Sequence, residues 1–140
     1  MSTTSLEVSK ELYEVSGWGY NHKQGDYCNF IWRQGSYKPY LTSLDENEHI
    51  PSIRKDLDKA IAPAYDLGYL LRKLPVLKDI DFRVEQDGAD ENGDCWVAYG
   101  VDYAAHREGD SNRWWSTDNA PEDATAKLCI ELFKQGILTK

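Results

Sequence analysis

The stretch Ala120-Pro-Glu-Asp-Ala-Thr-Ala-Lys-Leu-Cys-Ile-Glu-Leu-Phe-Lys-Gln-Gly136 carries the start and stop signals of an α-helix. Pro121 suits the first helical turn, where a missing N–H costs nothing. Glu122 and Asp123 follow it, and carboxylates at that point meet the positive end of the helix dipole. Gly136 supplies the left-handed position that commonly ends a helix. The sequence therefore predicts a helix that begins at Pro121 and ends just before Gly136.

Apolar side chains cover much of this predicted helix. The main row consists of Ala126, Cys129, Ile130 and Phe133. The residues that flank it are Ala124, Leu128 and Leu132. A face of this width is typical of a helix that packs on a sheet. Burial of each large side chain would stabilise the fold by about 1.5–3 kcal/mol. We therefore expect this helix to cover a sheet formed by the residues just before it.

Local patterns predict three more helical segments. Thr4-Ser-Leu-Glu7 has the spacing of a capping box and would open a short helix that ends at Gly17. Leucines at i, i+3, i+4 and i+7 predict a second helix between residues 67 and 74, stopped by Pro75. Residues 52–62 have apolar side chains at every fourth position, which indicates either a narrow amphipathic helix ended by Pro63 or an ordered loop.

Residues that favour β-structure separate these helices. We expect strands over residues 27–33 and 37–44, the second at a sheet edge because it contains Pro39. Alternating apolar residues predict three further strands, over 80–85, 96–103 and 113–117. The order is α-β-β-(α)-α-β-β-β-α. It predicts one α+β domain spanning residues 1–140, with an antiparallel sheet of about four or five strands and the helices on one face.

Charge and composition limit the classes of partner. The chain has 24 acidic and 16 basic residues among 140, a formal net charge of −8. This charge repels nucleic-acid phosphates and anionic lipids, and it favours a basic protein partner. The apolar runs are too short to span a membrane, and the first residues lack the pattern of a signal peptide. Cys28, Cys95 and Cys129 are an odd number at wide spacing, so we expect reduced thiols and a cytoplasmic protein.

Motifs for metal, cofactor or catalysis are missing from the sequence. The acidic segment from Asp87 to Asp94 does not match the ligand spacing of a calcium loop. His22, His49 and His106 have no Cys or His at zinc-ligand spacing. No phosphate loop or nucleophile elbow is present. We therefore expect no metal, no cofactor and no enzymatic activity. An open alternative is an enzyme whose catalytic residues are far apart in the sequence, such as a Cys28 nucleophile with a distant histidine.

Aromatic residues are abundant, with five tryptophans, nine tyrosines and three phenylalanines. Trp114 and Trp115 are adjacent, so on a strand they point to opposite faces and one should remain outside the core. Trp18 lies in another aromatic-rich segment. These side chains either fill the core or form an interface, because exposed Trp and Tyr offer large contact areas at little cost in rotamer entropy. We expect one exposed aromatic cluster.

Three segments together resemble a known group of proteins. They are Pro63-Ala-Tyr-Asp-Leu-Gly-Tyr-Leu-Leu-Arg-Lys-Leu-Pro75, residues 119–138, and, more loosely, Leu6-Glu-Val-Ser-Lys-Glu-Leu12. They are similar to small uncharacterised proteins of phages and prophage-bearing bacteria, whose last helix commonly begins Asp-Thr-Pro-Glu-Asp-Ala. Ala120 stands here in place of that Thr, which leaves the helix cap to Asp118 or Asn119. The resemblance implies a shared fold and a mobile-element setting, but no activity.

The leading functional hypothesis is that this is a non-enzymatic binding protein that acts on a protein partner. In a more specific form of the hypothesis, it is an inhibitor that occupies a basic, nucleic-acid-binding surface of a host or defence protein. Its candidate contact residues are Asp45, Glu46, Glu48, Asp87, Asp90, Glu91, Asp94, Trp18, Trp114 and Trp115. A homodimer is a further open alternative, and one that buried the aromatic patch would remove much of the basis for this hypothesis. The alternative is a protein that stacks a nucleobase or another planar ligand on an aromatic side chain, with His22 or Arg33 nearby.

Overall fold

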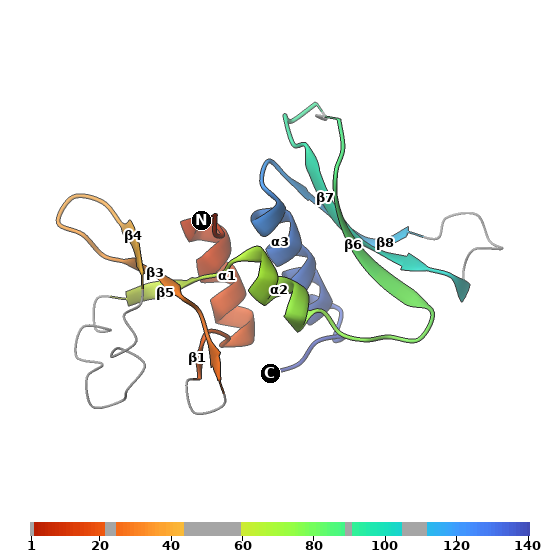
Figure 1. Cartoon of the computed structure of the whole chain (residues 1–140), viewed down its shortest axis with the longest axis horizontal. Helices are drawn as coiled ribbons and strands as arrows, with labels where there is room; N and C mark the ends of the chain where they lie inside the picture. The colour runs from red at the N-terminus through yellow and green to blue at the C-terminus, as the bar shows by residue number, and fades with distance from the viewer. Residues whose placement is uncertain (1, 22–24, 44–59, 89–90, 105–111) are drawn as a thin grey trace.

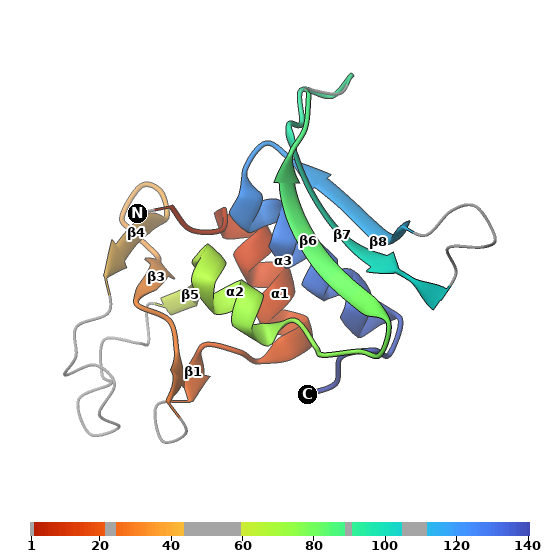
Figure 2. The same ribbon diagram turned by 45° about the vertical axis from the view of Figure 1, so that its right-hand side comes forward.

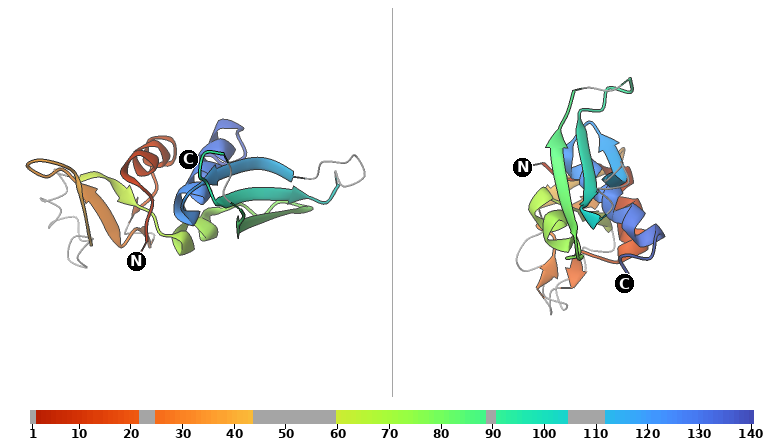
Figure 3. Two further views of the ribbon diagram at one scale, coloured as in Figure 1. Left: turned by 90° about the horizontal axis from the view of Figure 1, so that it is seen from above. Right: turned by 90° about the vertical axis from the view of Figure 1, so that its right-hand side faces the viewer.

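The computed structural model describes residues 2–21, 25–43, 60–88, 91–104 and 112–140. Within these residues, three helices lie between two three-stranded antiparallel sheets (Figure 1). The view from above in Figure 3 shows the helices as the middle layer. The predicted α+β class is confirmed. The prediction of one larger sheet with helices on one face is wrong, because the strands before and after α2 pair only among themselves.

The helices are α1 (Leu6–Ser16), α2 (Leu67–Lys73) and α3 (Pro121–Lys134). The first ends at Gly17, which has φ of 68° and donates its N–H to the Tyr13 carbonyl. At the start of α2, the Asp66 side chain accepts the N–H of Tyr69. Ala120 occupies the cap position of α3 without a side-chain bond, so the prediction that Asp118 or Asn119 caps this helix is wrong.

The segment before α1 also differs from its prediction, because Thr4 does not form a capping box. Its side chain is fully buried, and its hydroxyl accepts the N–H of Tyr65 at 3.0 Å and lies 2.6 Å from the Ser9 hydroxyl. The Thr4 carbonyl accepts the indole N–H of Trp32 at 3.2 Å. Thr4 therefore joins the N-terminal segment to α1, to the entry of α2 and to the first sheet.

The first sheet has β3 (Phe30–Arg33) at its centre, with β4 (Tyr40–Ser43) and β5 (Ala60–Ala64) at its edges. The strand predicted over residues 37–44 begins only at Tyr40, after Pro39, and its edge position is confirmed. The strand predicted over 27–33 is wrong as one unit, because β2 (Asp26–Tyr27) pairs with β1 (Tyr20–Asn21) in a separate ribbon. Residues 60–62 belong to β5 and not to a helix, and residues 52–59 lie outside the described residues.

The second sheet confirms the three strands predicted in this region. They are β6 (Ile80–Gln86), β7 (Trp96–Asp102) and β8 (Asn112–Asp118), in the spatial order β6-β7-β8 (Figure 2). β6 and β7 pair without interruption from Ile80 opposite Asp102 to Gln86 opposite Trp96. β8 pairs with β7 through a register shift between Ala98 and Gly100.

The central helix α3 contributes to two hydrophobic clusters. The flanking residues Ala124, Leu128 and Leu132 pack with Ala98 and the inward side chains of the second sheet. The main apolar row, Ala126, Cys129, Ile130 and Phe133, packs instead with residues of α1, α2 and the adjoining segments, such as Leu12, Tyr65 and Leu70. The expectation that this helix covers the sheet formed by the residues just before it is therefore confirmed through the flanking residues, whereas the main row meets α1 and α2.

Candidate functional site

The second sheet has an inner face that packs on α3 and an outer face that points away from the helices. Side chains alternate between the two faces along each strand. On β7, Ala98 and Gly100 point inward, while Val97, Tyr99 and Val101 form a separate apolar cluster on the other side. We call this second surface the outer face. Figure 3 shows no described helix covering it.

A β-bulge separates the two adjacent tryptophans. Across from β7, Ser116 pairs with Ala98 and Arg113 pairs with Gly100, so Trp114 and Trp115 together stand opposite Tyr99. Trp114 has a positive φ of 56°, and its ring stacks on Phe82 of the inner face with centroids 5.9 Å apart. The bulge thus places Trp114 inward and turns Trp115 to the outer face, as the sequence predicts for adjacent strand residues.

Trp115 is the largest exposed apolar side chain of the outer face. It is 53% exposed, and its ring lies over that of Tyr99 with centroids 5.0 Å apart. The Tyr99 hydroxyl donates to Glu85 at 3.0 Å, and loss of hydration with this hydrogen bond raises the pKa of Tyr99. The indole is therefore supported by a ring whose position is held by a hydrogen bond. Such preorganisation lowers the entropy lost when a partner binds.

Polar side chains surround the aromatic pair. Arg83 donates to the Tyr103 hydroxyl at 3.0 Å, and that hydroxyl donates to Asp81, also at 3.0 Å. Tyr103 itself is 47% exposed. The described residues of β6, β8 and the hairpin between β6 and β7 carry six carboxylates, Asp81, Glu85, Asp87, Glu91, Asp94 and Asp118, against two guanidinium groups, Arg83 and Arg113. The difference of four negative charges makes this part of the molecule acidic.

The predicted contact residues are only partly brought together. Asp87 and Glu91 are exposed at the hairpin end, and Asp94 accepts the Thr117 hydroxyl at 3.4 Å. Trp114 lies inward, and Trp18 packs against Phe133 with ring centroids 5.2 Å apart. Asp45, Glu46, Glu48 and Asp90 lie outside the described residues. Of the three candidate tryptophans, Trp115 is therefore the exposed one, while Trp18 and Trp114 are half-buried.

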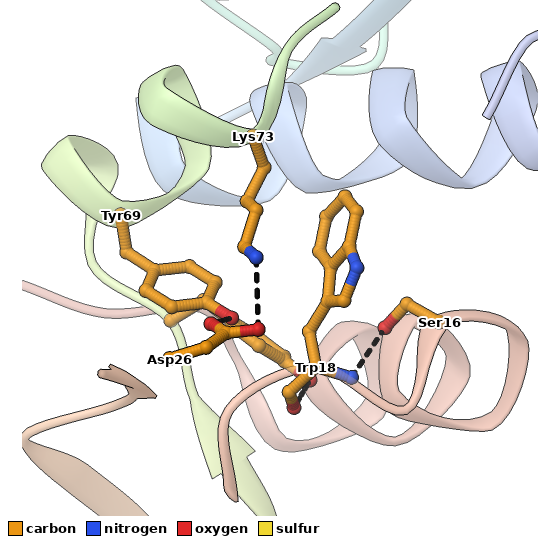
Figure 4. A network of polar contacts seen from close by, with 6 residues as sticks. Ser16, Trp18, Asp26, Tyr69 and Lys73 are labelled. Atoms are coloured by element: carbon orange, nitrogen blue, oxygen red, sulfur yellow. Dashed lines mark hydrogen bonds and ion pairs between the residues drawn. The ribbon is translucent and has the colours of Figure 1, made fainter. Parts of the chain in front are cut away.

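Sequence reasoning missed a polar network that joins the β1–β2 ribbon to α2 (Figure 4). Asp26 accepts the Tyr69 hydroxyl through one oxygen and pairs with Lys73 through the other, at 2.8 Å. The Lys73 ammonium lies 5.2 Å from the centroid of the Trp18 ring, within the range of a cation–π contact. Asp26 is 43 positions from Tyr69 and 47 from Lys73, so local spacing gave no signal for this network.

A pocket of about 260 Å³ opens beside this network and is lined by Gly25, Asp26, Tyr27, Tyr69, Arg72 and Lys73. Burial and the hydrogen bond to Asp26 raise the pKa of Tyr69, so the phenol remains protonated at neutral pH. Burial, with Asp66 and Asp26 nearby, likewise raises the pKa of Cys28, which is 2% exposed. Both groups are thus held in their neutral forms, which are poor nucleophiles and bases.

Of the two residues named for the alternative ligand site, the structure describes only Arg33. Arg33 is buried in the first sheet and is absent from the pocket lining, and His22 lies outside the described residues. Among the described residues, no three His, Cys, Asp or Glu side chains gather as metal ligands would. None of the described helices is both long enough and apolar enough to cross a lipid bilayer.

Comparison of the chain with protein-family models, curated proteins and solved structures found no match. The functional argument therefore depends on the outer face and the pocket themselves.

Proposed function

We propose that this protein is a non-enzymatic binding protein that acts on another protein through the outer face of its second sheet. The observation that carries the proposal is Trp115, a half-exposed indole backed by Tyr99. Trp, Tyr and Arg are the residue types that most often dominate binding energy at protein interfaces. Tyr103 and Arg83 beside this pair supply the other two types.

The charge around the outer face indicates the kind of partner. The excess of carboxylates there agrees in sign with the net charge of −8 for the whole chain. Complementary charge speeds encounter with a basic surface and disfavours acidic ones. The resemblance of the sequence to phage and prophage proteins supports a specific form of the proposal. In that form, the protein inhibits a host or defence protein by covering a basic, nucleic-acid-binding surface.

A capture experiment with matched variants tests the proposal. The wild type, Trp115→Ala and Tyr37→Ala would each be immobilised and exposed to a bacterial host lysate. Tyr37 is fully exposed in the segment between β3 and β4, so its loss controls for general aromatic stickiness. We expect a stoichiometric basic partner on the wild type and on Tyr37→Ala, with binding to Trp115→Ala weakened by at least about 30-fold, as for an interface hot spot.

Salt dependence separates the specific form from a purely apolar interface. Binding to a basic partner should weaken as ionic strength rises, because salt screens exposed charges. Equal capture by the wild type and Trp115→Ala would contradict the proposal. A partner retained without change at high salt would contradict the inhibitor of a basic surface but not the apolar contact.

The pocket beside α2 supports a second candidate, the binding of a small planar anion. Tyr27 is 39% exposed there, and Arg72 and Lys73 supply positive charge. A nucleotide could stack its base on Tyr27 and place its phosphate near Arg72. Titration calorimetry with nucleoside mono- and diphosphates, compared between the wild type and Arg72→Ala, tests this candidate. Absence of saturable heat with the wild type would exclude it.

A further inference from the structure

The edge strands of the two sheets differ in how they are protected from other strands. An unprotected edge presents unpaired backbone groups to any strand that approaches, so proteins shorten, bulge or interrupt their edges. β4 has four residues and directly follows Pro39, and β5 contains Pro63, which has no N–H to donate. β8 carries the bulge at Trp114. Each of these edges has a recognisable defect.

β6 has no such defect. Its seven residues pair with β7 in continuous register, and they include no proline, glycine or bulge. Among the described residues, no strand pairs with its other side, and Figure 2 shows this free edge. The inward side chains Ile80, Phe82 and Val84 are only half-buried. A neighbouring strand would therefore satisfy backbone groups and cover apolar surface at the same time.

The side chains of β6 are complementary to those of a second, antiparallel copy. If the two copies pair symmetrically about Phe82, Asp81 stands opposite Arg83 of the partner subunit, and this ion pair occurs twice. Ile80 then stands opposite Val84 of the partner subunit, also twice. Opposite charges and apolar side chains in directly facing positions stabilise a strand pair. Within β6, the facing pairs of this register are therefore either apolar or oppositely charged. Asp79, which would face Glu85 of the partner subunit, precedes the strand and has a positive φ of 61°, so it does not continue the extended backbone.

Neighbouring symmetric registers are less complementary within β6. Pairing about Arg83 would place that guanidinium against its own copy and Asp81 against Glu85 of the partner subunit. Like charges in directly facing positions are destabilising. Pairing about Val84 would keep an attraction between Arg83 and Glu85 of the partner subunit, but it would place Phe82 against Gln86 of the partner subunit in place of an apolar pair. The charges therefore exclude the register about Arg83, and the apolar pairs favour Phe82 over Val84 as the centre.

We propose that two copies of this chain associate through β6, in the register centred on Phe82, to form a continuous six-stranded antiparallel sheet. The twofold axis of such a pair runs perpendicular to the sheet, so both outer faces lie on the same side. The dimer presents two Trp115 side chains on one surface. This inference does not depend on the proposed function, since Trp115 is on β8, two strands away from the contact.

Charge reversal with rescue tests both the dimer and its register. Asp81→Arg and Arg83→Asp each turn two attractive cross-strand pairs into repulsive ones, and each should raise the dimer Kd roughly 30-fold. The double variant D81R/R83D restores both attractions and should dimerise like the wild type. An equimolar mixture of the two single variants should form heterodimers for the same reason. Analytical ultracentrifugation over a range of concentrations measures all four.

Two controls keep the result interpretable. Tyr103→Phe removes the hydrogen bonds that Tyr103 makes within one chain to Arg83 and Asp81 but leaves the charges of β6 unchanged, so it should remain dimeric. Trp115→Ala should also remain dimeric. Circular dichroism establishes that each variant is folded. A wild type that stays monomeric at its highest soluble concentration, or single variants that dimerise as well as the wild type, would overturn the proposal.

Discussion

Replacement of Thr4 by valine removes one hydroxyl at a fully buried position and leaves the shape of the side chain almost unchanged. In the wild type, that hydroxyl accepts the N–H of Tyr65 at 3.0 Å and contacts the Ser9 hydroxyl at 2.6 Å. Valine leaves the Tyr65 N–H without its acceptor in a site that excludes water. A buried donor left unsatisfied costs about 1–3 kcal/mol, so we expect Thr4→Val to lower the free energy of unfolding by about 2 kcal/mol.

Urea unfolding followed by circular dichroism measures this loss. With a denaturant slope of about 1–3 kcal/mol per molar, the midpoint should fall by about 1 M. Thr4→Ser is the matched control, because it keeps the hydroxyl and removes only a methyl group, at a cost of about 1 kcal/mol. Ser9→Ala in the Thr4→Val background removes the second hydroxyl of the pair. The double variant should therefore lose less than the sum of the two single losses.

The reasoning fails if Thr4→Val unfolds within about 0.5 kcal/mol of the wild type, which is the range of ordinary surface substitutions. It fails equally if Thr4→Ser is the more damaging of the two variants. In either case the buried hydroxyl would not be what joins the N-terminal segment to α2 and the first sheet.

Three further predictions concern other buried positions. Burial raises the pKa of Asp123 in the folded protein. At pH values above this raised pKa, ionisation of Asp123 therefore lowers the free energy of unfolding. The loss disappears as the pH falls towards about 4, the pKa of an aspartate in the unfolded chain. Asp123→Asn should therefore be more stable than the wild type at neutral pH, and the gap should close in urea unfolding at lower pH; a gap that widens would contradict this. Burial raises the pKa of Cys129 to about 12 and also raises the pKa of Cys28. Alkylation of the folded protein, followed by mass spectrometry, should therefore modify Cys95 first. Early labelling of Cys28 would contradict this prediction. Gly100→Ala places a Cβ 3.0 Å from the indole of Trp114. Overpacking should therefore lower the free energy of unfolding by about 1–3 kcal/mol, which thermal unfolding measures. An unchanged melting temperature would mean that the indole moves aside at no cost.

Local sequence signals predicted the parts of the fold that local physics determines. The helices begin and end near their expected residues because Gly17, Asp66 and Pro121 act within one turn of each terminus. The strands of the second sheet follow from alternation, and the turn residues between β6 and β7 make them neighbours. None of these features needs information from distant parts of the chain.

The division into two sheets could not be obtained in this way. β5 was missed because Ile61 continues an apolar repeat of helical spacing and Pro63 normally ends an element. In the structure, pairing with β3 outweighs both signals, and Pro63 is tolerated because β5 is an edge. Such pairing depends on residues about thirty positions away, which a local pattern does not contain.

The candidate site shows the same limit. Opposite orientations for Trp114 and Trp115 follow from strand geometry alone, and the structure has them. The support of Trp115 by Tyr99 depends on the register between β7 and β8, which includes a bulge. A bulge shifts the partner of every later residue by one, so no count along the sequence identifies Tyr99 as the neighbour of Trp115.

The place of α3 in the chain has a consequence for synthesis. Both sheets precede this helix in the sequence, and both clusters that hold the layers together include its side chains. While a ribosome is still extending the chain, the second sheet emerges with its apolar inner face uncovered until residues 121–134 follow. The nascent protein should therefore need a chaperone, or rapid translation of residues 121–134, more than the folded molecule does.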